Sequence, residues 1–248
     1  MKWIQRVGLG ILIAASCAMG AVAQENFSAL QSRWLEDAKQ GNDVSAYQWE
    51  RGYLLYPEGA AALLAHLSDY QLRIHLSHDP VRFITIGTVE NTLQQKEMLM
   101  ITAYRNTKEG MKKEMDVVLP TDEPYEFGKE VAAEQEIGLR REEWVELANQ
   151  HNPARHIKAL YTQDATYLSA GRLSLGWEEI IERYAYMESE SYSVDLVKKY
   201  LYQLSANKVI EVGRYYTGNN TSGPGGIYFI LWTKTAPGKW DIELDFNY

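Results

Sequence analysis

Acidic residues near the end of the chain are the first candidates for acid–base chemistry. Glu211 lies in an alternating segment, residues 208–217, and Asp245 lies in the last one, residues 240–247. A carboxylate enclosed in a poorly solvated site has a raised pKa, as a proton-transferring side chain requires. We therefore take Asp245 and Glu211 as the candidate catalytic residues for acid–base chemistry.

The last alternating segment also predicts how its side chains divide between two faces. Alternate residues of a flat strand point to opposite sides, so the apolar and acidic positions separate. We expect Trp240, Ile242, Leu244 and Phe246 on one face and Asp241, Glu243 and Asp245 on the other. A solvated acidic face is the simpler interpretation, whereas an enclosed one would raise at least one carboxyl pKa.

Side chains that combine a ring with a polar atom are candidates for a ligand site beside these carboxylates. The chain holds 17 tyrosines and 7 tryptophans, and such rings suit both pockets and ordinary strand packing. The candidates for ligand contacts are Tyr161, Tyr184, Tyr215, Trp232 and His156. In a proton-transfer reaction, Tyr161 or Tyr215 would be the hydrogen-bond donor.

Metal binding is tested by the spacing of the histidines. His75 and His78, followed by Asp79, are suitable ligand types, but residues three apart in an extended segment point to opposite faces. Only a turn at Pro80 would bring them together. We predict no metal site. We also predict no cofactor, because the sequence carries no phosphate loop, nucleophile elbow or cysteine pair.

The elements that would position these residues occur twice in the same order. Helical spacing is present at residues 27–41 and again at 139–150, and it matches Trp34 to Trp144. Residues 59–64 then match residues 176–181, each at the start of a short predicted helix. His156 lies on a further helix, which begins near Asn152-Pro153.

The predicted strands continue the repeat. Ile84–Thr88 matches Ile210–Arg214, with a glycine at the same place in each, and Ala103–Arg105 matches Leu231–Thr233. The offset between matched residues only grows along the chain, as it does when the second copy has longer loops. Residues 208–217, 227–234 and 240–247 are separated by turn residues and predict an antiparallel meander.

Four motifs in the C-terminal half carry a family resemblance. In chain order they are His156–Tyr161 leading into Asp164-Ala165-Thr166, then Gly176–Ile181, Glu211–Tyr215 and Gly238–Asp245. This order resembles the nuclear transport factor 2-like (NTF2-like) superfamily, in its SnoaL-like and ketosteroid-isomerase-like branch. The resemblance covers residues 139–248 and extends, as a weaker second copy, to residues 25–125.

The resemblance implies an α+β fold of tandem cone-shaped domains, each with helices packed on a strongly curved antiparallel sheet around a pocket. We assign residues 1–23 to a signal peptide, 25–125 to the first cone, 126–138 to a linker and 139–248 to the second cone. A different α+β domain ahead of a single cone is the alternative. Because cones of this superfamily commonly dimerise, we expect a monomer that is an internal pseudo-dimer, or a weak homodimer.

Ketosteroid isomerase offers a check on activity. Its catalytic Asp lies three residues past the Thr of the Asp-Ala-Thr motif, where this chain has Ser169. A serine needs a partner to take its proton before it can act as a base, so the isomerase activity is not carried over. Asp164 is expected to form a cap or turn. Asp245 is kept because strand ends of the superfamily often place an Asp near the pocket, and the Asp-x-Asn ending resembles that pattern.

The N-terminal segment has the parts of a secretory signal. Lys2 and Arg6 give a basic start, an apolar run follows, and Ala21-Val22-Ala23 is a small-residue cleavage site. The apolar run is shorter than the ~20 residues that span a bilayer. We expect cleavage after Ala23 and a periplasmic or secreted protein, with lipidation of Cys17 as the competing interpretation.

Charge limits the partners and leaves several functions open. The formal net charge is −8, and loss of Lys2 and Arg6 makes the mature chain more negative. Nucleic acid and anionic membranes need a basic face, so neither is expected to bind. The leading hypothesis is binding of a small, partly apolar ligand, or of a protein partner, in the pocket of the second cone. The alternatives are a lyase, isomerase or cyclase that transfers a proton there, and a structural envelope-associated protein with filled cavities.

Overall fold

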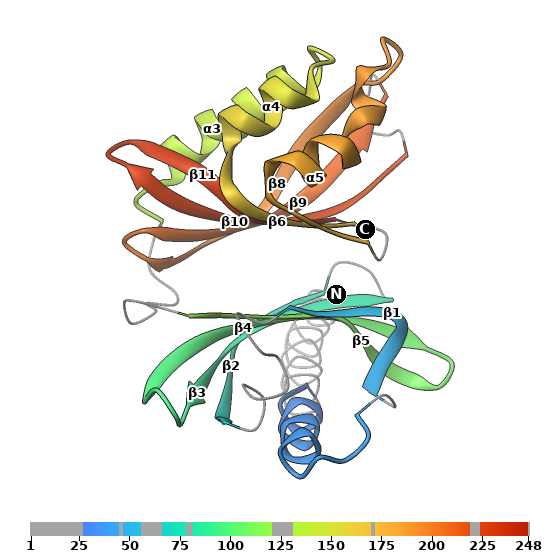
Figure 1. Ribbon diagram of the computed structural model, residues 1–248, viewed down its shortest axis with the longest axis vertical. Helices are drawn as coiled ribbons and strands as arrows, with labels where there is room; N and C mark the ends of the chain where they lie inside the picture. The colour runs from blue at the N-terminus through green and yellow to red at the C-terminus, as the bar shows by residue number, and fades with distance from the viewer. Residues whose placement is uncertain are drawn as a thin grey trace, which may run out of the picture. The chain divides into compact units, whose positions relative to one another are not determined.

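The computed structural model describes residues 27–44, 47–55, 66–77, 81–120, 131–169, 172–218 and 224–247. The chain divides into two compact units, residues 1–122 and 123–248, and each is described by itself (Figure 1). The predicted signal segment, Cys17, the motif at residues 59–64, His78 with Asp79, and the start of the predicted linker lie outside the described residues. No helix in the described ranges is long and apolar enough to cross a membrane.

The described part of unit 1 contains a helix and a curved five-stranded sheet. The helix covers residues 27–39, and the strands are β1 (Gln48–Leu55), β2 (Leu67–Ser77), β3 (Arg82–Asn91), β4 (Lys96–Thr107) and β5 (Gly110–Pro120). The strand order is β1-β5-β4-β3-β2, and all neighbours are antiparallel except β1 and β5. Trp34 of the helix is buried in one cluster with Val89 and Met100 of the sheet, so the helical spacing marks the buried face.

Unit 2 places its helices across one face of a curved six-stranded sheet (Figure 1). Its elements are α3 (Glu134–Ala148), α4 (Pro153–Leu160), β6 (Tyr161–Ser169), β7 (Arg172–Leu175), α5 (Gly176–Arg183), the 3-10 helix η2 (Ala185–Glu188), β8 (Val194–Ser205), β9 (Lys208–Thr217), β10 (Gly225–Ala236) and β11 (Lys239–Asn247). The strand order is β7-β6-β11-β10-β9-β8, and only β6 and β11 are parallel. The predicted C-terminal meander corresponds to β9, β10 and β11.

Local sequence signals explain where the helices of unit 2 begin. Asn152 caps α4, because its side chain accepts a hydrogen bond of 3.0 Å from the backbone N–H of Arg155. Gly176 opens α5 with φ of +73°, a conformation that favours glycine. Helix α3 begins at Glu134, inside the segment predicted as a linker. Asp164 is neither a cap nor a turn former, because it lies on the exposed side of strand β6.

The two sheets pair their strands in the same way once β7 is set aside. β6, β11, β10, β9 and β8 follow the order of β1, β5, β4, β3 and β2. Gly87 in β3 and Gly213 in β9 occupy the same register position. A Cβ at Gly87 would lie 2.7 Å from the carbonyl oxygen of Gln71, and one at Gly213 would lie 2.4 Å from that of Val197. Both glycines therefore let a neighbouring strand approach closely.

A β-bulge in the last strand of each sheet repeats as well. The register skips Glu114 in β5 and Glu243 in β11, next to matching residues of β4 and β10. An extra residue of this kind interrupts the alternation of side chains between the two faces. Beyond the bulge, Asp116 pairs with Thr102 just as Asp245 pairs with Ile230. The two aspartates thus occupy equivalent positions.

The bulge corrects the two faces predicted for the last strand. Trp240 and Ile242 belong to the core cluster beneath the helices, as expected for one face. Leu244 and Phe246 are buried but lie outside that cluster, whereas Asp245 lines a cavity on the helix side of the sheet. The prediction from a flat strand is therefore wrong beyond Glu243, because the extra residue exchanges the faces.

Candidate functional site

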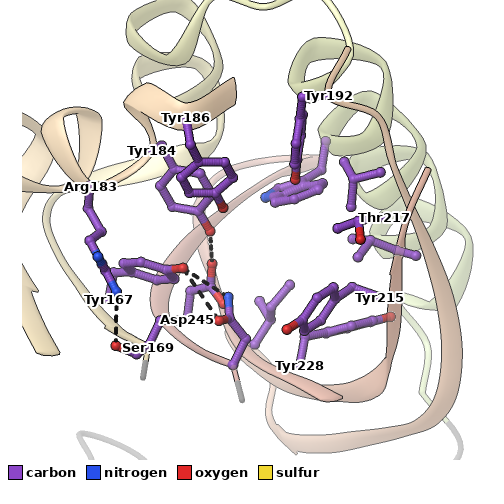
Figure 2. Close-up of a pocket in the computed structure, with 15 residues that line it drawn as sticks. Tyr167, Ser169, Arg183, Tyr184, Tyr186, Tyr192, Tyr215, Thr217, Tyr228 and Asp245 are labelled. Atoms are coloured by element: carbon purple, nitrogen blue, oxygen red, sulfur yellow. Dashed lines mark hydrogen bonds between the residues drawn. The ribbon is translucent and has the colours of Figure 1, made fainter. Parts of the chain in front are cut away.

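A cavity of about 330 Å³ opens in unit 2 between the helices and the sheet (Figure 2). This volume lies at the lower end of the ~300–1,000 Å³ typical of small-molecule sites. Tyrosine is the commonest residue type among those that line it: Tyr167, Tyr184, Tyr186, Tyr192, Tyr215 and Tyr228. Trp144 of α3 and Ile230 of β10 add apolar surface, and Asp245 and Arg183 are the charged residues among those that line the cavity.

Asp245 is held in place by two tyrosine hydroxyls. Its side chain is buried, with 2% of its surface exposed. Tyr161, the first residue of β6, donates a hydrogen bond of 2.7 Å to Oδ2, and Tyr184, just after α5, donates one of 2.8 Å to the same oxygen. The indole N–H of Trp144 in turn donates to the Tyr161 hydroxyl at 3.1 Å. The other carboxylate oxygen, Oδ1, receives no hydrogen bond from the residues that the structure describes.

Burial controls the protonation of this group. Removal from water raises the pKa of Asp245 to about 6, although the hydrogen bonds from Tyr161 and Tyr184 oppose the rise. The same burial, together with the nearby carboxylate, raises the pKa of both tyrosines well above the ordinary value. The tyrosines therefore remain neutral donors, while Asp245 changes charge close to neutral pH.

The mouth of the cavity is also aromatic. Tyr186 is half exposed and stacks on Tyr184, with ring centroids 5.9 Å apart, and its other neighbour is Tyr192 at 5.3 Å. Deeper in, the Asn247 amide donates to the Tyr167 hydroxyl at 3.1 Å. Arg183 donates to the backbone oxygen of Ser169 at 3.3 Å, as Figure 2 shows. A ligand would therefore meet ring faces before it reached Asp245.

Glu211 belongs to a separate buried network. It lies outside the cavity lining, contrary to expectation, and is fully buried. Arg141 of α3 forms an ion pair with it at 2.9 Å, and the Tyr228 hydroxyl and the Trp232 indole donate hydrogen bonds of 2.7 and 3.2 Å. Because three donors occupy the carboxylate, Glu211 positions Tyr228 in the cavity wall, and Trp232 supports the network without reaching the cavity.

His156 is buried behind the cavity wall, neither at the mouth nor on the surface. Its ring packs edge-on against Trp144, Tyr161 and Tyr184, with centroid distances of 4.7, 6.0 and 5.8 Å. Neither ring nitrogen has a hydrogen-bond partner among the described residues. Burial lowers the pKa of His156 to about 3, so the ring is neutral and serves as packing for the two donors of Asp245.

The predicted site residues thus divide into two groups. Asp245, Tyr184 and Tyr215 line the cavity, and Tyr161 contacts Asp245 from behind. Glu211, Trp232 and His156 do not line it. Lining residues that the sequence did not single out include Tyr167, Tyr192, Tyr228, Arg183 and Asn247. Period-two spacing after Tyr161 on β6, and before the end of β11, was the signal that could have found Tyr167 and Asn247.

The equivalent place in unit 1 holds an internal ion pair. Asp116 pairs with Lys113, and both side chains are almost completely buried. The Lys113 ammonium lies 3.3 Å from the centroid of the Trp34 ring, and the Thr102 hydroxyl donates to Asp116. Burial lowers the pKa of Lys113 to about 8 and raises that of Asp116. Ile242 takes the place of Lys113 in unit 2, so Asp245 has no such partner.

The inner network of unit 1 is neutral where that of unit 2 is charged. Gln31 lies at the helix position of Arg141, and Thr85 at the strand position of Glu211. Gln31 accepts a hydrogen bond of 2.7 Å from the Tyr104 hydroxyl. The two units therefore hold these buried ion pairs at different positions of the same strand arrangement: Lys113 with Asp116 in unit 1, and Arg141 with Glu211 in unit 2.

Comparison with known proteins adds the following. No family model and no curated protein matches the sequence. Among solved structures, an NTF2-like protein of unknown function from Shewanella oneidensis is 20% identical, with 46% of this chain and 96% of that chain covered and a TM-score of 0.40. A ketosteroid isomerase-like protein from Erwinia carotovora atroseptica is 20% identical, with 47% and 95% covered and a TM-score of 0.38.

A third solved structure is an NTF2-like protein from Cytophaga hutchinsonii, 15% identical, with 46% and 96% covered and a TM-score of 0.35. These three proteins carry the name of the superfamily, or of the branch, that the sequence motifs resemble. Each match spans less than half of this chain. Within the residues that the structure describes, no cluster of His, Cys, Asp and Glu has the arrangement of a metal site.

Proposed function

We propose that the chain carries two copies of one cone and that the second copy binds a small, partly apolar organic molecule around Asp245. The observation that carries this proposal is that one oxygen of the Asp245 carboxylate lacks a hydrogen bond from the described residues. Asp245 lines a cavity, two tyrosines satisfy Oδ2, and Oδ1 receives no hydrogen bond from the described residues. A carboxylate oxygen of a cavity-lining residue that receives no hydrogen bond from the described residues can accept one from a ligand or from water. The aromatic wall supplies the apolar contact.

A fragment screen tests the binding function. Ligand-observed NMR with the mature chain, residues 24–248, should yield compounds that compete for one site. Leu196→Trp should abolish their binding, because Leu196 lines the cavity and the larger ring fills it. Leu139→Trp is the matched control, since Leu139 is exposed on α3 and away from the cavity. Binding that survives Leu196→Trp, or no competing fragment at all, would contradict the proposal.

Proton transfer is the second candidate function, and the protonation of Asp245 favours it. A carboxylate with a pKa of about 6 is suited to general-base work near neutral pH, and Tyr184 and Tyr161 are adjacent donors. In this version Asp245 takes a proton from a carbon of the bound molecule. Fragments from the screen would be incubated in D₂O and examined by NMR. Deuterium should enter the bound compound with the natural protein and not with Asp245→Asn; no incorporation in either would eliminate catalysis and leave binding.

Export and oligomeric state complete the proposal. We infer that the mature protein begins at Gln24 in the periplasm or outside the cell, because the first residues have the three parts of a secretory signal. N-terminal sequencing of exported material would detect an acylated Cys17 instead. The duplicated unit supports a monomer that acts as an internal pseudo-dimer, or a weak homodimer. An open, polar-floored cavity disfavours the purely structural alternative.

A further inference from the structure

The ligand class can be taken one step beyond the proposed function, on which this inference rests. We propose that the cavity of unit 2 binds a protonated organic amine whose ammonium group meets Asp245 Oδ1 and whose apolar body lies among the tyrosine rings. Three independent features of the molecule support this assignment: the charge balance of its buried carboxylates, the aromatic lining, and the arrangement at the equivalent place in unit 1.

The first feature is the missing cation beside Asp245. Buried acidic side chains in the described residues are Glu114, Asp116, Glu211, Asp241 and Asp245. The first four form ion pairs, with Arg82 and Arg105, Lys113, Arg141, and Arg140 and Lys239 respectively. Asp245 has only neutral tyrosine donors. An isolated buried carboxylate is costly unless it is paired, and the open cavity allows a ligand to supply the cation.

The aromatic lining is the second feature. A cation is attracted to the negative face of an aromatic ring, more strongly so when water is excluded. Trp144 and the tyrosines listed above surround the space that leads to Asp245. Amphipathic rings of this kind accept both an ammonium group and the apolar carbon atoms next to it. A carboxylate at the floor and ring faces on the walls are the two groups that recognise an organic cation.

The third feature comes from unit 1, where the chain carries its own ammonium at the equivalent place. Lys113 lies over the ring of Trp34 and pairs with Asp116. Trp34 matches Trp144 along the sequence, and Asp116 matches Asp245 in the strand register. Unit 1 therefore shows that this arrangement of tryptophan and carboxylate holds a primary ammonium. In unit 2 the lysine is replaced by Ile242 and a cavity is present instead.

Other charged groups near Asp245 do not reverse this preference. Burial raises the pKa of Tyr161, Tyr167, Tyr184 and Tyr228, so they are neutral, and His156 behind them is neutral because burial lowers its pKa to about 3. Arg141 and Glu211 neutralise each other behind Tyr228. Arg183 also lines the cavity and donates to the Ser169 backbone. An anion held by Arg183 is the competing outcome, and the test includes it.

The test compares three compounds of one shape by isothermal titration calorimetry on the mature chain near pH 7.5. These are 2-phenylethylamine, which is cationic, 2-phenylethanol, which is neutral, and phenylacetate, which is anionic. The amine should bind at least about tenfold more tightly than the alcohol, and the anion should not bind measurably. Asp245→Asn should remove the preference for the amine. Glu243→Gln should keep this preference, because Glu243 lies two residues away along β11 and is paired with Lys208.

A pH titration of the natural protein provides a measurement that needs no variant. The amine stays protonated throughout, whereas Asp245 loses its charge as the pH falls through about 6. Affinity for the amine should therefore fall about tenfold between pH 7.5 and pH 5, while the affinity of the alcohol should change little. Affinity for the amine that is independent of pH would overturn the inference.

The outcomes separate this inference from the proposed function. Equal binding of the amine and the alcohol, unaffected by Asp245→Asn, would overturn the cation assignment and leave a small-molecule site. Binding of phenylacetate alone would do the same and would transfer recognition to Arg183. No saturable binding of the amine up to about 10 mM, a range that still detects millimolar affinity, would also overturn it, whereas the binding function stands or falls on the fragment screen and its Leu196→Trp control.

Discussion

Asp116 and Asp245 occupy equivalent positions in two sheets with the same strand order, yet one faces a lysine and the other a cavity. In unit 1 the charge is balanced within the chain, by Lys113. In unit 2 the carboxylate is buried beside tyrosine hydroxyls alone, and burial raises its pKa to about 6. The difference teaches that one strand arrangement supports either a closed core or a polar cavity, depending on whether the chain supplies the cation.

The largest expected effect is on unit 1. Asp116→Asn should destabilise it by roughly 3–5 kcal/mol at neutral pH, because the buried Lys113 ammonium loses its partner. Burial already lowers the pKa of Lys113 to about 8, so the cost should shrink as the pH rises past that value. Urea denaturation at neutral pH and above pH 8 measures the loss of stability. The double change Lys113→Met/Asp116→Leu should recover most of it. A neutral effect of Asp116→Asn would break the comparison.

The matched glycines sharpen the comparison, since both units should respond alike. Gly87→Ala and Gly213→Ala should each cost roughly 2–3 kcal/mol, because the new Cβ would meet a backbone oxygen of the neighbouring strand. Gly138→Ala is the control: its Cβ would meet no atom closer than 3.7 Å, and alanine favours the helix. Thermal denaturation of the three variants measures these costs. Unequal costs for Gly87→Ala and Gly213→Ala would contradict the equivalence of the two positions.

Asp245→Asn should act in the opposite direction to Asp116→Asn. Because the pKa of folded Asp245 is about 6, above the ordinary 3.8, its stabilising contribution is full below about pH 4 and is lost as the pH rises through 6. The neutral amide avoids this loss, so the variant should be more stable than the natural protein by roughly 2–3 kcal/mol at pH 8 and similar to it at pH 4. Melting temperatures measured across this pH range test the prediction, with Glu243→Gln as the control. An Asp245→Asn variant that is less stable than the natural protein at pH 8 would contradict it.

The smallest effect concerns the inner network. Arg141→Gln should cost roughly 1–2 kcal/mol, because Glu211 loses its cation but keeps the Tyr228 and Trp232 donors. The double change Arg141→Gln/Glu211→Thr copies Gln31 and Thr85 of unit 1 and should restore stability. Double-mutant-cycle analysis of urea denaturation measures the coupling between the two positions, and additive costs would show that the two networks are not interchangeable.

Features of the fold and of the site were predictable from the sequence where they depend on residues that are close together along the chain. Strand β9 coincides with the predicted segment 208–217, since alternation and turn residues act between near neighbours. Asp245 was predicted as a site residue, but the bulge that brings it to the cavity was not, because the sequence of residues 240–246 alternates between apolar and acidic without a break at Glu243. His156 was predicted to contact a ligand but does not line the cavity, because the rings that bury it come from α3, β6 and the end of α5, which only tertiary packing brings together.

The bulge at Glu243 has a consequence for how such a chain changes over generations or in the hands of an engineer. Point substitutions exchange side chains but leave each position on its own side of the pleat. Removing Glu243 would close the bulge, and because Asp245 would then follow Ile242 by two positions, regular alternation would keep Asp245 on the cavity side. While the strand keeps its length, the carboxylate reaches the cavity because the extra residue precedes Asp245; loss of one codon at Glu243 would remove the bulge without changing which residue the cavity presents.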